Sequence, residues 1–224
     1  MKNTFFTILV VAVLLIISCK SGTENQSTSE LSKNESPELA KVIEEQFDIV
    51  NDSLKFNSAT IENFNKEGNS IDVYWLNNER DTILRFYRKY NAKGELIGAE
   101  YYEEGDTEAS KDTVYTNENG LKVEASLNAE GKITWKSTIQ TDENGNEILR
   151  TYENSKGEPR GLDSLFFDDK NRPIKGFYKN ANGKKYSTKT YKYLAADQFD
   201  HWTERNLLVN DTLSQKHFRV LEYH

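Results

Sequence analysis

The residues of this chain that could carry out metal or acid–base chemistry are its three histidines and its adjacent carboxylates. His201, His217 and His224 all lie within the last 24 residues. A metal site needs two or three ligands at matched spacing, each oriented by a second partner. The histidines do not have such a spacing, so we predict that they are exposed or lie in turns and that the chain holds no metal.

Two pairs of adjacent carboxylates, Asp168-Asp169 and Glu103-Glu104, could supply the acid and base of a glycosidase. Both pairs fall in predicted turns of a very acidic chain, so we expect them to be solvated. The sequence contains no Gly-x-Ser-x-Gly motif and no phosphate-binding loop. We therefore predict no catalytic residues, no cofactor and no enzymatic activity, while the identity of any ligand-binding residues stays open.

The remaining chemically special residue is Cys19, the only cysteine of the chain. It follows Lys2 and an uncharged apolar run of 13 residues from Phe5 to Ile17. A run of this length is typical of a secretory signal and is shorter than the roughly 20 residues that span a bilayer. A single cysteine also excludes an internal disulfide, so burial and hydrogen bonds must hold the fold together.

The letters "IISC" at 16–19 resemble the lipobox of bacterial lipoproteins, with a branched apolar residue, a small residue and then cysteine. This resemblance implies cleavage after residue 18 and lipid attachment to Cys19, so that the lipid holds the protein on a membrane. Lys20 resembles the residue found at this position in outer-membrane lipoproteins. The resemblance therefore implies a lipid-anchored protein of the bacterial cell envelope, in the outer membrane.

The segment after the cysteine, residues 19–36, is rich in Ser, Thr, Asn, Glu and Lys, which predicts a flexible tether. Removing residues 1–18 changes the formal net charge from −7 to −8. An acidic chain without a basic block excludes a nucleic-acid partner, whose phosphates require clustered Lys and Arg. The remaining residues, 37–224, are predicted to form one folded domain.

The elements of this domain are marked by a turn motif of the form Asn/Asp-x-x-Gly. Asn or Asp caps the backbone at the first position of such a turn, and Gly supplies the left-handed conformation at the fourth. Several positions from 65 to 117 are 13 residues apart, and later spacings vary between 11 and 17. Full matches occur at Asn65–Gly68, Asn91–Gly94, Asn117–Gly120, Asn128–Gly131, Asp142–Gly145, Asn154–Gly157 and Asn180–Gly183. Matches without the glycine occur at Asn78–Asp81, Asp169–Arg172 and Asp197–Asp200.

Between these turns, apolar and polar residues alternate with period two, as at residues 121–127. This pattern indicates antiparallel strands with one buried face. We therefore predict a mainly all-β fold: a curved antiparallel meander of about eleven to twelve short strands that is open and barrel-like or two-layered.

Residues 37–55 are predicted to form an amphipathic helix that packs on this sheet. Ser36 would cap the helix, and Pro37 would occupy its first turn. The apolar residues of the segment recur at spacings of three and four, as on one face of a helix. They are Leu39, Val42, Ile43, Phe47, Val50 and Leu54.

The last unit, "YKYLAADQFDHWTERNLLVND" at 191–211, resembles a YD repeat of the RHS-like family. That family's units often read Tyr-x-Tyr-Asp-x-x-Gly-Asn-Trp-x-x-Arg, and similar units are frequent in envelope lipoproteins of the Bacteroidota. The matching residues here are Tyr191, Tyr193, Asp197, Trp202 and Arg205. Residues 194–196 look inserted, and Asp200-His201 replace Gly-Asn. The resemblance implies a spiralling antiparallel sheet, export and no catalytic residue.

Strand alternation places Trp202 with Glu204, Asn206 and Leu208, and does not by itself bury it. We nevertheless predict burial from the size of Trp202 and from the repeat pattern. The leading functional hypothesis is a tethered interaction or scaffold domain with a protein or glycan partner. The alternatives are a carrier of an apolar ligand on the concave sheet and an enzyme of an unrecognised type.

Overall fold

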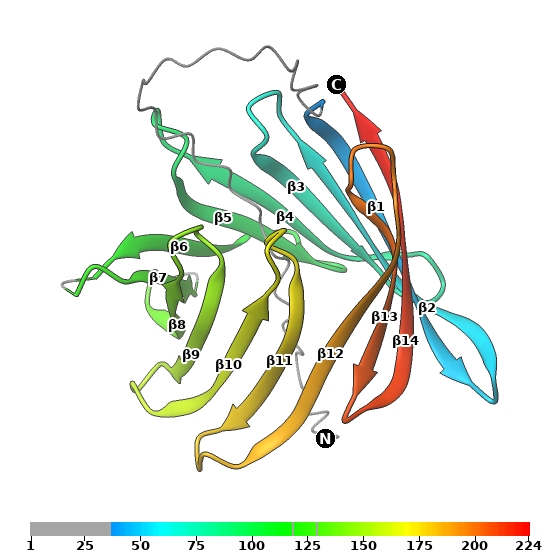
Figure 1. The fold of residues 1–224 in the computed structure, drawn as a ribbon. Coiled ribbons are helices and arrows are strands. Elements are labelled where there is room, and N and C mark those ends of the chain that lie inside the picture. Colours follow the sequence, from blue (N-terminus) through cyan, green and yellow to red (C-terminus); the bar gives the residue numbers. More distant parts are fainter. Residues whose placement is uncertain (1–36, 118, 129) are drawn as a thin grey trace, which may run out of the picture.

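The computed structural model describes residues 37–117, 119–128 and 130–224 of the 224-residue chain. The predicted signal peptide (1–18), the predicted lipid-attachment residue Cys19 and the predicted tether (19–36) lie outside the described residues. Figure 1 shows the described part as one continuous β-meander.

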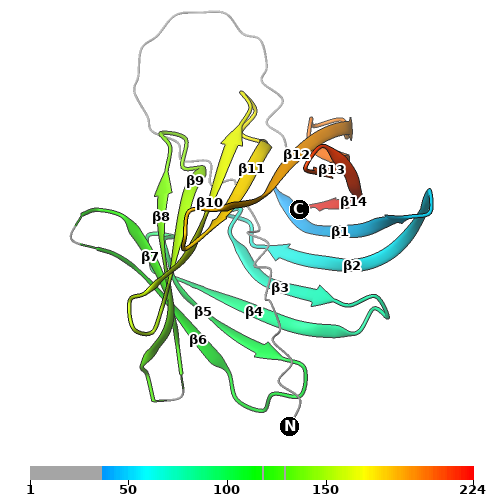
Figure 2. The same cartoon turned by 90° about the horizontal axis from the view of Figure 1, so that it is seen from below.

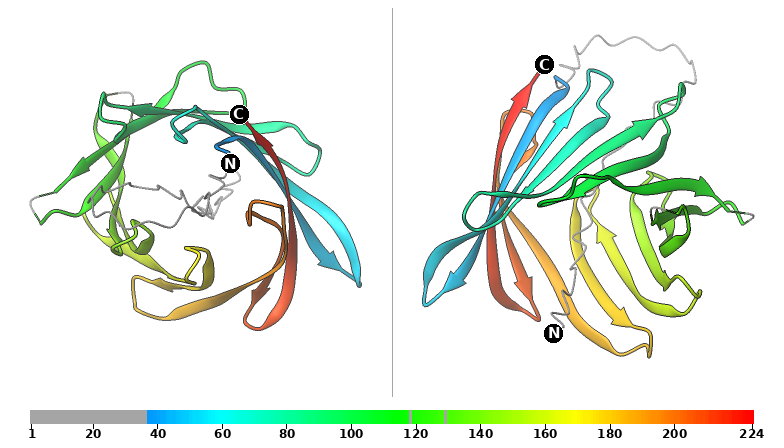
Figure 3. Two further views of the ribbon diagram at one scale, coloured as in Figure 1. Left: turned by 45° about the horizontal axis from the view of Figure 1, so that its top comes forward. Right: turned by 180° about the vertical axis from the view of Figure 1, so that it is seen from behind.

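Fourteen antiparallel strands form this meander and close into a barrel, because β1 pairs with β14 as well as with β2. Figures 2 and 3 show the curvature of the sheet and its closure. The all-β meander is confirmed. The prediction of eleven to twelve strands in an open or two-layered sheet is wrong. The strands are β1 (Leu39–Val50), β2 (Ser53–Phe64), β3 (Ser70–Leu76), β4 (Thr82–Tyr90), β5 (Leu96–Glu103), β6 (Ser110–Thr116), β7 (Lys122–Leu127), β8 (Ile133–Thr141), β9 (Glu147–Asn154), β10 (Pro159–Phe167), β11 (Pro173–Asn180), β12 (Lys185–Ala196), β13 (Trp202–Val209) and β14 (Thr212–Tyr223).

The helix predicted over residues 37–55 is wrong, because this segment contains β1, a tight turn and the start of β2. Asn51 and Asp52 both have positive φ, at 50° and 61°, as a two-residue hairpin turn requires. Strand alternation places Val42 on one face and Phe47 on the other, so the apolar residues do not form a single stripe. The described residues contain no helix long and apolar enough to cross a membrane.

The Asn/Asp-x-x-Gly turns are confirmed at all seven full matches, where the glycine N–H donates to the carbonyl of the first residue. In the first of them the Asn65 side chain also accepts the backbone N–H groups of Glu67 and Asn69. Two of the turns without glycine begin one residue earlier than predicted, at Asn77 and Asp168. In these turns the left-handed position is taken by Arg80 and Asn171, and in the third, at Asp197, by Asp200.

Gly131 and Gly145 adopt φ values of 74° and 83°, as the turn motif predicts. A Cβ atom added at either position would meet no heavy atom within 4 Å, so only backbone strain opposes a side chain there. We expect Gly131→Ala to lower the free energy of unfolding by about 1 kcal/mol. Gly131→Asn should cost less, because asparagine tolerates the left-handed region. Urea unfolding of the two variants checks this, and equal stability of the alanine variant and the parent would contradict it.

The two faces of the barrel wall differ in exposure. Glu44, Tyr152 and His217 share one face through the strand registers and are 8%, 7% and 4% exposed. Val220 and Phe166 lie on the alternate face and are 60% and 48% exposed, although Ala59, Val123 and Ala125 of that face are 3%, 2% and 1% exposed. The first face is concave and lines the barrel interior.

Candidate functional site in the barrel interior

Three arginine–glutamate pairs reach across an intervening strand, and we call them crossing pairs. Side chains on strands two apart approach each other most closely on the concave side of a curved sheet, so these pairs indicate the interior face. Arg88 on β4 bonds Glu62 on β2 at 3.0 Å. The other two are Arg150 (β9) with Glu124 (β7) at 2.6 Å and Arg205 (β13) with Glu44 (β1) at 2.8 Å.

Four ion pairs of the alternate face join adjacent strands, and Arg80 of the β3–β4 turn also reaches Glu45 of β1 at 2.8 Å on that face. The side chains of these five pairs are 29–56% exposed, whereas those of the crossing pairs are 10–28% exposed. The four pairs between adjacent strands lie at three places around the barrel, because two of them share β14. They are Lys41–Glu222, Lys89–Glu100, Lys136–Glu153 and Lys216–Glu204. The interior therefore holds the buried charges, and the exterior holds solvated ones.

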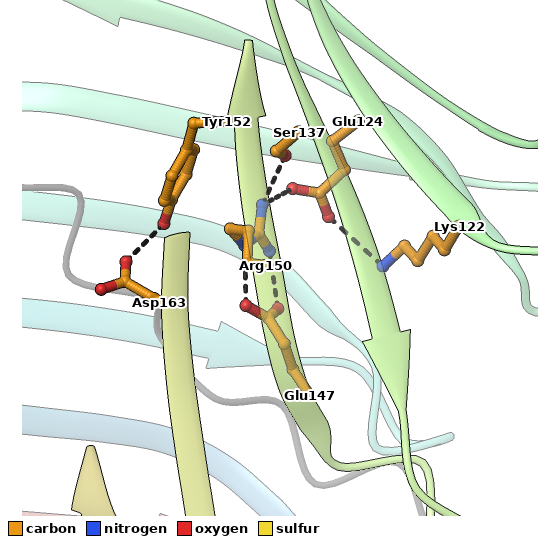
Figure 4. A network of polar contacts seen from close by, with 7 residues as sticks. All are labelled: Lys122, Glu124, Ser137, Glu147, Arg150, Tyr152 and Asp163. Carbon is orange, nitrogen blue, oxygen red and sulfur yellow. Dashed lines mark hydrogen bonds and ion pairs between the residues drawn. The ribbon is translucent and has the colours of Figure 1, made fainter. Parts of the chain in front are cut away.

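The first interior network is centred on Arg150 (Figure 4). Its guanidinium group bonds both oxygens of Glu147 at 2.7 Å, reaches Glu124 at 2.6 Å and donates to the Ser137 hydroxyl at 2.9 Å. Lys122 lies 3.3 Å from the other side of Glu124. Burial lowers the pKa of Arg150, but the two carboxylates outweigh it and raise that pKa, so the arginine stays charged.

The second interior network lies where β1, β13 and β14 close the barrel, and we call it the seam network. Glu44 is its centre and accepts from Arg205, His217 and Arg219, each at 2.8 Å. Burial raises the pKa of the Glu44 carboxyl, but Arg205, Arg219 and the His217 hydrogen bond outweigh it and hold that pKa well below its usual range. One buried carboxylate thus joins the first strand of the barrel to its last two.

Trp202 packs inside this seam, and its predicted burial is confirmed at 6% exposure. The guanidinium carbons of Arg205 and Arg219 lie 4.2 and 3.6 Å from the centroid of its ring, and Tyr193 packs against its edge. The predicted grouping of Trp202 with Glu204 is wrong. A bulge in β13 near Glu204 changes the alternation and turns Trp202 to the interior beside Arg205.

His217 is the one histidine whose placement differs from the prediction. It is buried at 4% exposure, whereas His224 is exposed and His201 is half-buried at the end of the β12–β13 turn. Burial lowers the pKa of His217, and Arg205 and Arg219 lower it further against the opposing effect of Glu44, so the ring is neutral in the folded protein near pH 7. Among the described residues, no group of three or more His, Cys, Asp or Glu side chains could hold a metal ion.

The seam network predicts that stability falls as the pH falls. Below about pH 6.5 His217 is protonated in the unfolded chain but stays neutral in the folded chain, because its pKa is lowered there, and this difference destabilises the fold. Below about pH 4.3 the unfolded chain also protonates Glu44 before the folded chain does. Both effects have the same sign, so the melting temperature should decrease in two steps. His217→Gln should remove the upper step, and an unchanged pH profile in this variant would contradict the assignment.

The paired carboxylates do not form an acid–base site. Asp169, Glu103 and Glu104 are exposed, and Asp168 caps its own turn and pairs with Arg172 at 2.8 Å. The backbone N–H and side chain of Arg172 lower the pKa of Asp168 against the opposing effect of burial, so it stays ionised. These contacts are structural, as expected for turn residues.

Of the interior glutamates and arginines, only Arg205 stood out in the sequence. A usable signal was present, because Glu62–Arg88 and Glu124–Arg150 have the same separation of 26 residues. That separation is two units of the 13-residue turn spacing, which returns a residue to the same face two strands later. Of the residues that resembled a YD repeat, Arg205 lies over the rings of Tyr191 and Trp202 and Tyr193 packs against Trp202, whereas Asp197 caps the β12–β13 turn.

Comparisons with known proteins add little to this geometry. No protein-family model matches the chain, and no curated protein matches it. A solved structure with a similar chain course is a porin-like protein from Bacteroides uniformis, at 15% sequence identity and a TM-score of 0.34. The similarity covers 80% of this chain and 58% of the porin-like chain, so this chain spans less than two thirds of that protein.

Proposed function

We propose that this protein is a lipid-anchored protein of the bacterial cell envelope whose barrel faces water and acts as an interaction or scaffold domain. The lipobox-like "IISC" at residues 16–19 supports the anchor. The observation that carries the proposal is the charged exterior of the barrel. The partner would be a protein or a glycan, and the proposed role involves no catalysis.

The exterior ion pairs argue against a barrel embedded in lipid. A membrane-spanning barrel presents an apolar band about 25 Å tall to the lipid, and a Lys or Arg at its midplane costs about 2–4 kcal/mol. Lys136 lies in the middle of β8 and pairs with Glu153 at 2.6 Å on the exterior. Lys89 on β4 and Glu100 on β5 form another exterior pair at 2.6 Å, on another side of the barrel. A lipid anchor on Cys19 would hold such a barrel on a membrane without inserting it.

The interior supports a scaffold role over the carriage of an apolar ligand. Its wall carries three crossing pairs, and their carboxylates and guanidinium groups bond mainly to one another. Burying an apolar molecule against these charges would remove their remaining contact with water without offering new partners. The interior contacts therefore act chiefly to hold the curvature of the wall, and the exterior and the turns remain available for partners.

Replacing Cys19 tests the anchor. Lipid attachment requires the cysteine sulfur, so we expect Cys19→Ser to abolish incorporation of labelled fatty acid and to move the protein out of the membrane fraction. Ser21→Ala lies outside the "IISC" motif and leaves the cysteine in place, so it serves as a control for expression and export. A Cys19→Ser variant that is processed and fractionates like the parent would overturn the proposed anchor.

A further inference from the structure

The two interior networks differ in charge balance, because the seam network has an excess of positive charge. In the first network Arg150 is bonded to two glutamates and Lys122 pairs with one of them, so the charges balance. In the seam network one glutamate, Glu44, is bonded to two arginines, Arg205 and Arg219. Among the described residues, no second carboxylate forms an ion pair with either of these arginines. His217, the third partner of Glu44, is neutral and contributes no negative charge.

Neighbouring groups do not cancel this excess. Glu62 is the next carboxylate whose charge acts on Arg219, and it is already bonded to Arg88 at 3.0 Å. Burial raises the pKa of Tyr191, against the opposing effect of Arg205, so the phenol beneath Arg205 is neutral. A charge held in a poorly solvated interior is costly unless it is paired.

The two guanidinium groups also have more donors than Glu44 accepts. Both oxygens of Glu44 are used, one by Arg205 and His217 and the other by Arg219. The Nε atom of Arg205 is buried and has no hydrogen-bond partner. The Arg219 side chain is 26% exposed, so part of this arginine can still be reached from the barrel interior. The guanidinium carbon of Arg219 lies 3.6 Å from the centroid of the Trp202 ring, which fixes the guanidinium group in place.

We propose that the seam network binds a small oxyanion, a carboxylate or phosphate group, at the exposed edge of Arg219 inside the barrel. A guanidinium group binds an oxyanion through two parallel hydrogen bonds, which distinguishes an oxyanion from a halide. The bound anion would neutralise the excess charge of the Arg205–Glu44–Arg219 cluster. The Arg150 network has no such excess and would bind no anion.

Titration of the purified protein with inorganic phosphate at constant ionic strength tests the proposal. The readout is the set of arginine Nε–H signals in NMR spectra, assigned with single variants. We expect saturable shifts of the Arg205 and Arg219 signals with a Kd of about 1 mM, and no saturable shift for Arg150. Acetate should compete with phosphate, and chloride should not. Shifts that grow linearly, or that are equal at Arg150, would overturn the proposal.

Variants separate a specific site from general charge effects. Arg219→Gln should lose the saturable response, and Arg219→Lys should weaken it at least fivefold because an ammonium cannot form the two parallel bonds. Arg85→Gln removes the same charge from an exposed position on the alternate face of β4 and should leave the titration unchanged. If Arg219→Gln fails to fold, the phosphate affinity of Arg219→Lys still tests the proposal. Phosphate affinity equal to that of the parent in Arg219→Lys would overturn the proposal.

Discussion

Replacing Glu44 with glutamine is expected to lower the free energy of unfolding by about 3–5 kcal/mol, the cost of breaking a buried ion pair on one side. Glu44 is 8% exposed and accepts from Arg205, His217 and Arg219. A neutral amide would leave two guanidinium groups next to each other in the interior without a counter-charge. The seam is where the first and last strands of the barrel join, so the loss should also weaken closure.

Urea unfolding followed by circular dichroism measures the effect of Glu44→Gln. The matched control is Glu222→Gln, which removes a carboxylate from the same pair of strands, β1 and β14, but on the exterior. Glu222 is 54% exposed in its pair with Lys41, so its loss should cost no more than about 1 kcal/mol. Equal costs in the two variants would show that the seam network does not hold the barrel closed.

Replacing Trp202 with alanine is expected to lower the free energy of unfolding by about 3–5 kcal/mol, as for other large buried aromatic residues. The ring is 6% exposed and packs against Tyr193 and the guanidinium groups of Arg205 and Arg219. Its removal would leave a cavity and also free two arginine side chains that it now fixes in place. Both consequences act on the same seam.

The control for Trp202→Ala is Tyr115→Ala, because Tyr115 is 42% exposed on the exterior face of β6, near the end of that strand. That variant should lose no more than about 1 kcal/mol, the range of a cross-strand contact. Tryptophan fluorescence supplies a second measurement, since loss of Trp202 should remove a blue-shifted component from the spectrum. Unchanged melting together with loss of a red-shifted, easily quenched component would contradict the buried position.

The turns were predictable from the sequence because their cause is local. An Asn or Asp at the first position of the turn caps the backbone with its own side chain. The glycine at the fourth position supplies positive φ, as at Asn128–Gly131. In two of the three turns where another residue takes the left-handed position, the turn begins one residue earlier than predicted, at Asn77 and Asp168, whereas the turn at Asp197 keeps its predicted position. Local chemistry thus locates a turn and leaves its register open when glycine is missing.

The first strand could not be predicted in the same way, because its identity depends on residues about 170 positions away. The interior half of β1 is polar, and Glu44 is stable there only because β13 and β14 bring arginines to it. Because the inner face of β1 is polar, the segment lacks the apolar alternation of a half-buried strand. The apolar residues of the segment also match the spacing of one helix face. The Asn51-Asp52 turn was the local signal that contradicted a helix.

The interior site was hidden for a related reason. Each crossing pair joins residues on strands two apart, so neither residue is informative without the other and without the curvature of the sheet. The bulge in β13 near Glu204, which turns Trp202 inward, likewise leaves no mark in the alternation of the sequence. Only the constant separation of 26 residues between Glu62 and Arg88, and between Glu124 and Arg150, could have been found beforehand.

The most direct test of the proposed water-facing barrel is sedimentation velocity of the chain from residue 20 onward, purified without detergent. Our account predicts a single well-defined species with a β-rich circular dichroism spectrum and cooperative unfolding, because charged pairs such as Lys136–Glu153 cover the exterior. A chain that aggregates in buffer and becomes a folded, well-defined species only in detergent or lipid would contradict the account and indicate a barrel embedded in a membrane.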